Sequence, residues 1–299
     1  MADSTEKMSL QTTSCSKINL FLAVTGRRPD GYHEIETVFL PLAEPCDTVS
    51  MAESDTGLRV SSDEPALPND SRNLCHKAAT AYAAAAGISP AWSIHVKKNI
   101  PVAGGMAGGS SNAAAVLRLL QKTHKALSDQ ELKRLALSLG ADVPFFLDPR
   151  PSVGRGVGEC LNPVKVGGNI PLVVLAPLFP TSARWAYEHC AKVDDSKANL
   201  SVVLAALAAG DLVALAAAVR NDLGPVLYRK FPALRIFQKD LLDAGALAAE
   251  ISGSGSSLFA LCESDEKAAD VIERMNEHYG DAVHCLRGKP LMEVDSGEK

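Results

Sequence analysis

The order of apolar and polar residues near the start of the chain predicts a β-hairpin. Residues 17–24, KINLFLAV, alternate between two sides as a strand requires, so Lys17 and Asn19 are expected on the same face. The turn-forming letters PDG follow at 29–31, and EIETVFLPL at 34–42 has the pattern of the returning strand. A lysine and an asparagine are therefore predicted side by side on the first strand.

A helix, a strand and a glycine-rich loop are predicted next. Residues 73–86 have the pattern of a helix that ends at Gly87. The alternating stretch 91–97 predicts a strand, and it leads directly into the segment 99–120, NIPVAGGMAGGSSNAAAVLRLL. The glycines of this segment are followed by strong helix formers, so the predicted order is strand, loop, helix.

A capping box marks a further helix. Ser128 is followed three residues later by Glu131, which is the pattern that starts a helix over 129–139. Gly140 is expected to end it. Asp142 lies two residues beyond this end.

The hydrophobic pattern restarts in the second half of the chain. Strands are predicted over 171–178 and in the stretch 247–262, with alanine-rich helices between them and a helix over 266–278 before a last strand. Glycine, proline and polar residues cluster near residue 165, which predicts two domains, 1–165 and 166–299.

Composition and charge exclude several classes of protein. Of the 299 residues 46% are hydrophobic, and the formal net charge of -5 disfavours nucleic acid as a partner. The seven cysteines are odd in number and never form a CxxC pair, which fits neither a disulfide framework nor a zinc site. No apolar run has the length of a membrane span, and the first residues lack the pattern of a signal peptide. A cytoplasmic protein is therefore expected.

The segment 101–111, PVAGGMAGGSS, can cradle a phosphate group. Its four glycines let the backbone turn N–H groups toward an anion, and the following helix adds the positive end of its dipole. The alternative is a flexible loop with no ligand. A P-loop is excluded because serines stand where its lysine is required, and no GxGxxG with a ribose-binding acid is present. The turn SGSGSSL at 252–258 and the loop GRGVGE at 154–159 would each, taken alone, be simple turns.

Three of these segments together resemble the motifs of the GHMP kinase family. They are KINLFL, PVAGGMAGGSSNAA and SGSGSSLFA, and they occur in the order and at the separations of that family. The resemblance implies an α+β fold of two domains, an N-terminal ribosomal-protein-S5-like domain and a C-terminal ferredoxin-like α/β sandwich. It also implies ATP-dependent phosphorylation of a small alcohol, with Mg²⁺.

DGYH at 30–33, GADVPFFL at 140–147 and GRGVGE are similar to segments of one branch of that family. This branch phosphorylates the 2-hydroxyl of 4-diphosphocytidyl-2-C-methyl-D-erythritol in the non-mevalonate route to isoprenoid precursors. Ala103 and Ala107 depart from the family, which often has glycine there, and Gly224 stands where an acid is frequent. The alternatives are a kinase of the same family that phosphorylates homoserine or mevalonate, a nucleotide sensor without turnover, and a purely structural protein.

The resemblance assigns a catalytic pair. Asp142 is expected to orient the substrate hydroxyl and accept its proton, while Lys17 keeps Asp142 ionised and stabilises charge on the transferred group. The alternatives are a solvated lysine at a strand start and a turn-forming acid.

The resemblance also assigns the binding residues. The expected ATP-binding residues are Pro101, Val102, Ala103, Gly104, Gly105, Met106, Ala107, Gly108, Gly109, Ser110 and Ser111, with Asn73 and Lys98 beside the adenosine. The expected substrate-binding residues are Asn19, Tyr32, His33, Thr181, Trp185, Gly253, Ser254 and Gly255. Ser110 or Ser111 is the expected protein oxygen near Mg²⁺. The alternatives are a helix cap for Asn73, a solvated lysine for Lys98 and core packing for the aromatic residues. A monomer or homodimer is expected.

Overall fold

The computed structural model describes residues 9–102, 104–190 and 200–292. Strands and helices alternate along the chain, which confirms the α+β class. The chain forms two compact units, and the segments of the two units alternate along the sequence. The first unit consists of Met1–Cys15, Cys46–Ile100 and Gly108–Asp148, and the second of Ser16–Pro45, Pro101–Ala107 and Pro149–Lys299. The division at residue 165 stays a prediction.

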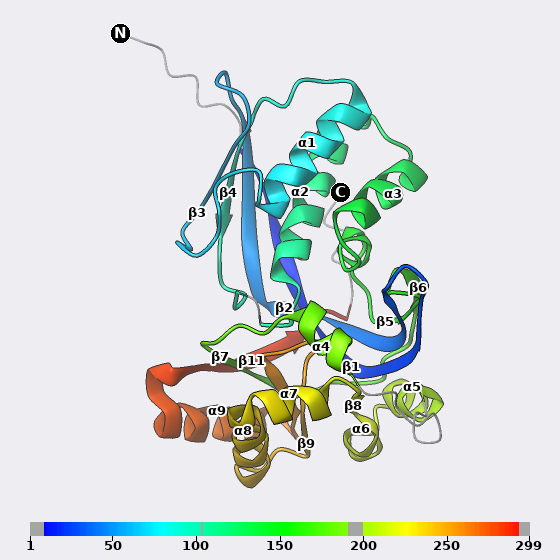
Figure 1. The fold of residues 1–299 in the computed structure, drawn as a ribbon. Coiled ribbons are helices and arrows are strands. Elements are labelled where there is room, and N and C mark those ends of the chain that lie inside the picture. Colours follow the sequence, from blue (N-terminus) through cyan, green and yellow to red (C-terminus); the bar gives the residue numbers. More distant parts are fainter. Residues whose placement is uncertain (1–8, 103, 191–199, 293–299) are drawn as a thin grey trace. The chain divides into compact units, whose positions relative to one another are not determined.

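The first unit is a small sheet with helices packed beside one another. Its elements are the first part of β1 (Leu10–Arg27), the last part of β2 (His33–Glu53), β3 (Arg59–Ser62), β4 (Trp92–Lys97), α1 (Leu74–Ala86), α2 (Gly108–His124), α3 (Asp129–Leu139) and the 3-10 helix η1 (Pro144–Leu147). Strand β4 pairs antiparallel with β2 and parallel with β3. Helices α1 and α2 lie side by side (Figure 1).

The predicted helix ends of this unit are confirmed. Asn73 caps α1, and Gly87 ends it with a left-handed φ of 66°. Ser128 and Glu131 form the full capping box of α3. Gly140 follows α3 as expected, but its φ of 165° is ordinary extended backbone, so it ends the helix without the left-handed geometry of Gly87.

The second unit is built mainly on antiparallel strands, with one short parallel pair between residues 21–22 and 220–221. Its strands are most of β1 (Leu10–Arg27), the first part of β2, β5 (Ser152–Arg155), β6 (Cys160–Pro163), β7 (Leu172–Pro177), β8 (Arg220–Asn221), β9 (Ala248–Ile251), β10 (Leu258–Leu261) and β11 (Val283–Pro290). Its helices are α4 (Ala183–His189), α5 (Leu200–Ala209), α6 (Leu212–Ala218), α7 (Gly224–Lys230), α8 (Pro232–Asp243), α9 (Asp265–Tyr279) and the 3-10 helix η3 (Gly280–Ala282). Strands run in the order β11, β7, β10, β9, and α8 and α9 cover one face of them (Figure 1).

The stretch predicted as a strand over 247–262 is two strands with a turn between them. β9 and β10 pair antiparallel, with Leu258 opposite Ile251. Gly253 and Gly255 both have positive φ, 55° and 75°, which reverses the chain at SGSGSS. The apolar residues on either side of the turn join the core of the unit.

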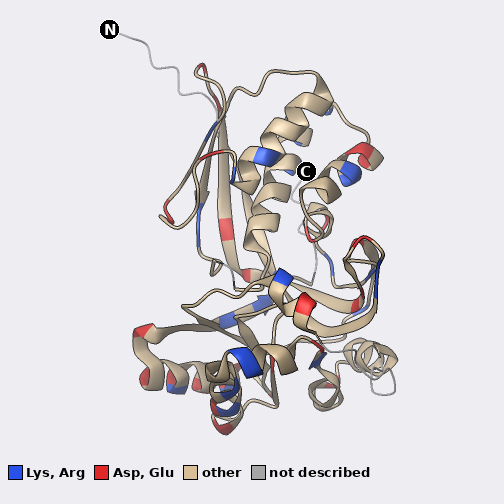
Figure 2. Cartoon of the chain, in the orientation of Figure 1, with Lys and Arg blue, Asp and Glu red and all other residues tan. Residues whose placement is uncertain are grey.

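Charge is mixed over the exposed helices. Figure 2 shows acidic and basic residues interspersed on α8 and α9. Within the described ranges, no helix combines the length and apolar character that crossing a membrane requires.

Candidate functional site

Three segments far apart in the sequence meet in the second unit. The backbone N–H of Lys17 on β1 donates to Met106 O at 3.2 Å. From the SGSGSS turn, Ser257 N donates to Gly104 O at 3.0 Å and Ser252 Oγ donates to Gly105 O at 3.2 Å. The strand KINLFL, the glycine loop and the glycine-serine turn therefore form one hydrogen-bonded cluster.

Lys17 is buried in this cluster. Only 4% of the residue is exposed, and its ammonium donates to Asn19 Oδ1 at 2.7 Å. Asn19 in turn donates to Thr37 Oγ1 at 2.7 Å, and the Phe39 ring centroid lies 5.3 Å from the lysine Nζ. The predicted shared face of Lys17 and Asn19 is confirmed. Burial rules out the alternative of a solvated lysine, and a buried ammonium needs such polar partners.

Gly105 and Gly253 make the close contact between loop and turn possible. Gly105 has a φ of 76°, and a Cβ atom there would stand 2.8 Å from Gly255 O. A Cβ atom on Gly253 would stand 3.0 Å from Asn19 Oδ1 and 3.5 Å from Lys17 Nζ. These glycines are required by tertiary packing as well as by backbone conformation.

The turn is held from outside by side chains of β8 and of the segment before α4. Asn221 Nδ2 donates to Ile251 O at 2.8 Å and to Gly253 O at 2.7 Å. Thr181 Oγ1 donates to Ser254 O at 2.8 Å, so the structure brings Thr181 to the turn. Asn221 was not predicted, because its neighbours NDLGPV gave no signal for a contact with this turn.

Gly224, a departure from the family pattern, lies close to a partly buried acid, Glu250. A Cβ atom at this position would stand 3.2 Å from Glu250 Oε1. Burial raises the pKa of Glu250, and the Tyr228 hydroxyl donates to it at 2.8 Å. A second carboxylate at 224 would be repelled here, which gives the glycine a physical reason.

His33 stacks on Tyr187, which was not predicted to lie at this site. Their ring centroids are 5.5 Å apart at an interplanar angle of 25°. Burial, with a smaller effect of Arg27, lowers the pKa of His33 from its ordinary value and so favours the neutral imidazole, which can both donate and accept. Tyr32 is 64% exposed.

Trp185 lies on α4, the helix that also carries Tyr187, and two other side chains of the protein contact its ring. Lys230 Nζ lies 3.6 Å from the Trp185 ring centroid, and the His189 ring stacks on it at 4.4 Å. Trp185 and Tyr187 both pack against the core of the second unit, so the contacts with Lys230 and His189 are what distinguish the tryptophan. The one sequence signal that could have indicated Tyr187 is its position two residues after Trp185 in ARWAYEH.

These contacts predict that Tyr187, rather than Trp185, supplies the second stacking ring for a base at His33. Tyr187→Leu is expected to raise the KM for a cytidine-containing substrate by about 5- to 100-fold, because base stacking is worth roughly 1 to 3 kcal/mol. Trp185→Leu is the matched control and is expected to leave this KM within about threefold. If steady-state kinetics showed a larger rise of this KM in Trp185→Leu than in Tyr187→Leu, the stacking role would belong to Trp185.

In the first unit, Asn73 and Lys98 make internal contacts. Asn73 Oδ1 accepts from Cys75 N at 2.8 Å and its Nδ2 donates to Pro68 O at 2.8 Å, which is the helix-cap alternative. The Lys98 ammonium forms an ion pair with Asp47, with only 7% of the lysine side chain exposed. Lys98 is therefore not the solvated lysine of the alternative.

The start of α2 presents accessible backbone and one accessible hydroxyl. Gly109 is exposed and Ser110 partly exposed, whereas Ser111 is buried and accepts from Ser14 Oγ at 2.7 Å. The first turn contains no acid that would oppose an anion.

The donor set fits Mg²⁺ held mainly by a nucleotide. In the part of the chain that the structure describes, no group of three or more His, Cys, Asp or Glu residues could hold a metal ion. Mg²⁺ takes oxygen ligands and commonly binds through substrate phosphates, and the Ser110 hydroxyl is an oxygen of the right kind. Ser110 is thus the better candidate of the two serines.

The remaining loop positions vary in exposure. Pro101 is half-buried, Val102 is exposed and Met106 is buried. Ala107 has a φ of 57°, in the left-handed region, which explains why glycine suits this position. Ala103 lies outside the described residues. Asp142 is partly exposed, between α3 and η1 of the first unit.

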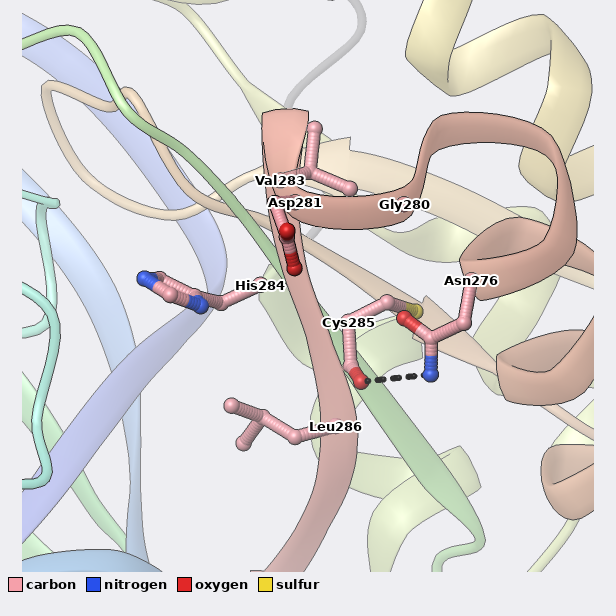
Figure 3. A pocket seen from close by; sticks show the side chains of 7 residues that line it. All are labelled: Asn276, Gly280, Asp281, Val283, His284, Cys285 and Leu286. Atoms are coloured by element: carbon pink, nitrogen blue, oxygen red, sulfur yellow. Dashed lines mark hydrogen bonds between the residues drawn. The ribbon is translucent and has the colours of Figure 1, made fainter.

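A shallow pocket of about 400 Å³ lies at β11 and the end of α9. It contains none of the predicted site residues, since it is lined by Asn276, Gly280, Asp281, Val283, His284, Cys285 and Leu286. Figure 3 shows His284 and Leu286 directed to one side of β11 and Cys285 to the other.

Comparison with known proteins identifies the family of the chain. The family profile described as GHMP kinases N terminal domain matches residues 73–148, and the profile described as GHMP kinases C terminal matches residues 203–281. The chain belongs to the GHMP kinase family, so it is a small-molecule kinase that uses ATP.

The curated relatives narrow the class further. The chain is 36% identical over 271 residues to a protein of Chlorobium phaeobacteroides named 4-diphosphocytidyl-2-C-methyl-D-erythritol kinase, with 90% of this chain and 92% of the relative covered. A crystal structure of 4-(cytidine 5'-diphospho)-2C-methyl-D-erythritol kinase is 32% identical, with a TM-score of 0.78 over 93% of this chain and 98% of that one. The homoserine kinase of Cytophaga hutchinsonii has a TM-score of 0.77 at 20% identity over 97% of both chains, which shows a shared fold alone.

Proposed function

We propose that the chain transfers the γ-phosphoryl group of ATP to the 2-hydroxyl of 4-diphosphocytidyl-2-C-methyl-D-erythritol in the non-mevalonate route to isoprenoid precursors. The observation that carries the proposal is the cluster in which buried Lys17 meets the glycine loop and the SGSGSS turn. Relatives of that name, matched over about nine-tenths of the chain, support the choice of substrate.

Lys17 and Asp142 are the proposed catalytic pair. Phosphoryl transfer needs little covalent chemistry from a protein, but it needs the attacking hydroxyl in line and charge balanced in a loose transition state. Asp142 orients the hydroxyl and accepts its proton. Lys17 favours the ionised form of Asp142 and stabilises charge on the transferred group.

The glycine loop and the start of α2 are the proposed phosphate site. Backbone N–H groups at Gly108 and Gly109 and the positive end of the α2 dipole attract the phosphates. Mg²⁺ bound with ATP would neutralise phosphate charge, and Ser110 would hold it on the protein side. Asn73 and Lys98 stay predicted to lie beside the adenosine.

The cytidine end of the substrate is proposed to bind at Tyr32, His33 and Tyr187, with Thr181 and the SGSGSS turn nearby. The neutral imidazole of His33 can hydrogen-bond a cytosine edge. We also propose a cytoplasmic enzyme that acts as a monomer or homodimer, a state that light scattering would measure.

A coupled assay of ADP release tests the substrate. With Mg²⁺ and ATP, the cytidine compound is expected to be turned over well, and mevalonate and homoserine poorly. Faster turnover of either of these alcohols would make the substrate assignment wrong. Binding of ATP without turnover of any of the three would instead favour a nucleotide sensor.

A further inference from the structure

The first unit contains a buried carboxylate with four hydrogen-bond donors. Asp47 lies on β2 with none of its surface exposed. Its Oδ1 accepts from the backbone N–H groups of Asn99 and Ile100, both at 2.8 Å. Its Oδ2 accepts from Asn112 Nδ2 at 2.8 Å and from the Lys98 ammonium. Every acceptor direction of this carboxylate is therefore used.

The donors come from both ends of the glycine loop. Lys98, Asn99 and Ile100 immediately precede Pro101, and Asn112 belongs to the first turns of α2. A Cβ atom on Gly108, the first residue of α2, would stand 3.1 Å from Lys98 Nζ. Asp47 thus connects residues 98–100, which precede the loop, to helix α2, which follows it, and all of these residues belong to one compact unit.

Two serines extend this network. Asn112 Nδ2 also donates to Ser14 Oγ at 2.9 Å, and Ser14 Oγ donates to Ser111 Oγ at 2.7 Å. Ser111 is therefore oriented by the same network, next to Ser110. We refer to Ser14, Asp47, Lys98, Ser111 and Asn112 as the Asp47 network.

A carboxylate is required at its centre. An asparagine would keep one acceptor oxygen for the two backbone N–H groups, but its NH₂ group would face the Lys98 ammonium and Asn112 Nδ2, which are both donors. The ammonium would then be buried without a counter-charge. Lys98 and Asn112 would have to move, and the first turn of α2 with them.

We propose that Asp47 is a positioning residue for nucleotide binding, which sets the two ends of the glycine loop through Lys98, the 99–100 backbone and Asn112. This inference rests on the proposed binding of ATP phosphates at the start of α2. Asp47 acts through other groups and is not a catalytic residue.

The test is Asp47→Asn with a matched control in the second unit. Asp222 is the control because it is similarly buried and accepts from a backbone N–H, that of Val24 at 2.9 Å, and from the Arg220 guanidinium at 2.6 Å. Asp47→Asn is expected to raise the KM and the Kd for ATP at least about tenfold, while kcat at saturating ATP and the KM for the alcohol stay within about threefold. Asp222→Asn is expected to lower the melting temperature by a similar amount and leave ATP affinity unchanged.

A second variant separates positioning from stability. In Asp47→Asn combined with Lys98→Met, both charges are absent, so part of the lost melting temperature should return. ATP affinity is expected to stay low because the first turn of α2 is no longer held by Asp47, and to fall below that of the single variant Lys98→Met, which lacks the same lysine and keeps the carboxylate. If the melting temperature and the ATP affinity recovered together, Asp47 would have a structural role only and the proposal would be overturned. Equal loss of ATP affinity in Asp47→Asn and Asp222→Asn would overturn it as well.

Ser14→Ala keeps the proposal testable if Asp47→Asn does not fold. It removes the outer link of the network and leaves all four donors of Asp47 in place, so a rise of about two- to fivefold in the KM for ATP is expected, and no change would count against the proposal. Failure of the wild-type protein to bind ATP would refute the proposed function itself, whereas wild-type binding with unaffected Asp47→Asn would refute only this inference.

Discussion

Asp142→Asn is expected to lower kcat by about 10² to 10⁴, the range typical of a positioned acid–base group, with little change in ATP affinity. The substitution keeps the shape of the side chain and removes its charge, so the hydroxyl of the substrate would lose its orienting partner and proton acceptor. Steady-state turnover with thermal melts as folding controls measures this. Activity near that of the wild type in a folded variant would remove Asp142 from the mechanism.

Lys17→Met is expected to cause a comparable loss of kcat through lost electrostatic stabilisation. If each charge is useful only with the other in place, the double variant should be hardly worse than either single variant. If the loss of kcat in the double variant equalled the product of the two single losses, the two residues would act independently. Because Lys17 is buried against Asn19 and Phe39, a melting curve of each variant is needed beside the kinetics.

The second large effect is expected at the glycine loop, where Gly109→Ala should weaken ATP binding at least about tenfold. A Cβ atom at Gly109 would meet only Leu74 Cδ1, at 3.6 Å, so the fold has room for it. Alanine is also a better helix former than glycine, so stability should not fall. Loss of ATP affinity without loss of melting temperature, measured by calorimetric titration, would thus report blocked access of phosphate to the backbone.

Gly105→Ala is the contrasting variant from the same loop. Its positive φ and the proximity of Gly255 O predict a loss of stability of roughly 1 to 3 kcal/mol, together with reduced activity. Gly108→Val is a poor probe of phosphate binding, because its side chain would press on Ile100 and Lys98 and disturb the fold as well. Normal ATP binding by Gly109→Ala would show that the loop has a structural role only.

The sequence by itself determined the local elements and the motifs. Ser128 with Glu131 predicted a capping box, and Gly87 predicted the end of α1, because the donors and the backbone geometry involved lie within a few residues. The alternation of KINLFL placed Lys17 and Asn19 on one face, since strand geometry alone decides that. The family and the expected fold followed from three motifs in order.

Only the tertiary structure decided which partner each polar or aromatic side chain has. Lys98 meets Asp47, 51 residues earlier in the chain, and Asn221 meets the turn at Gly253, 32 residues later. His33 stacks on Tyr187, whereas Lys230 and His189 contact the ring of Trp185. Local pattern shows that a side chain is polar or aromatic and on which face it lies. Its partner depends on how distant segments pack, since buried charges and donors must be satisfied by whatever group the fold brings to them.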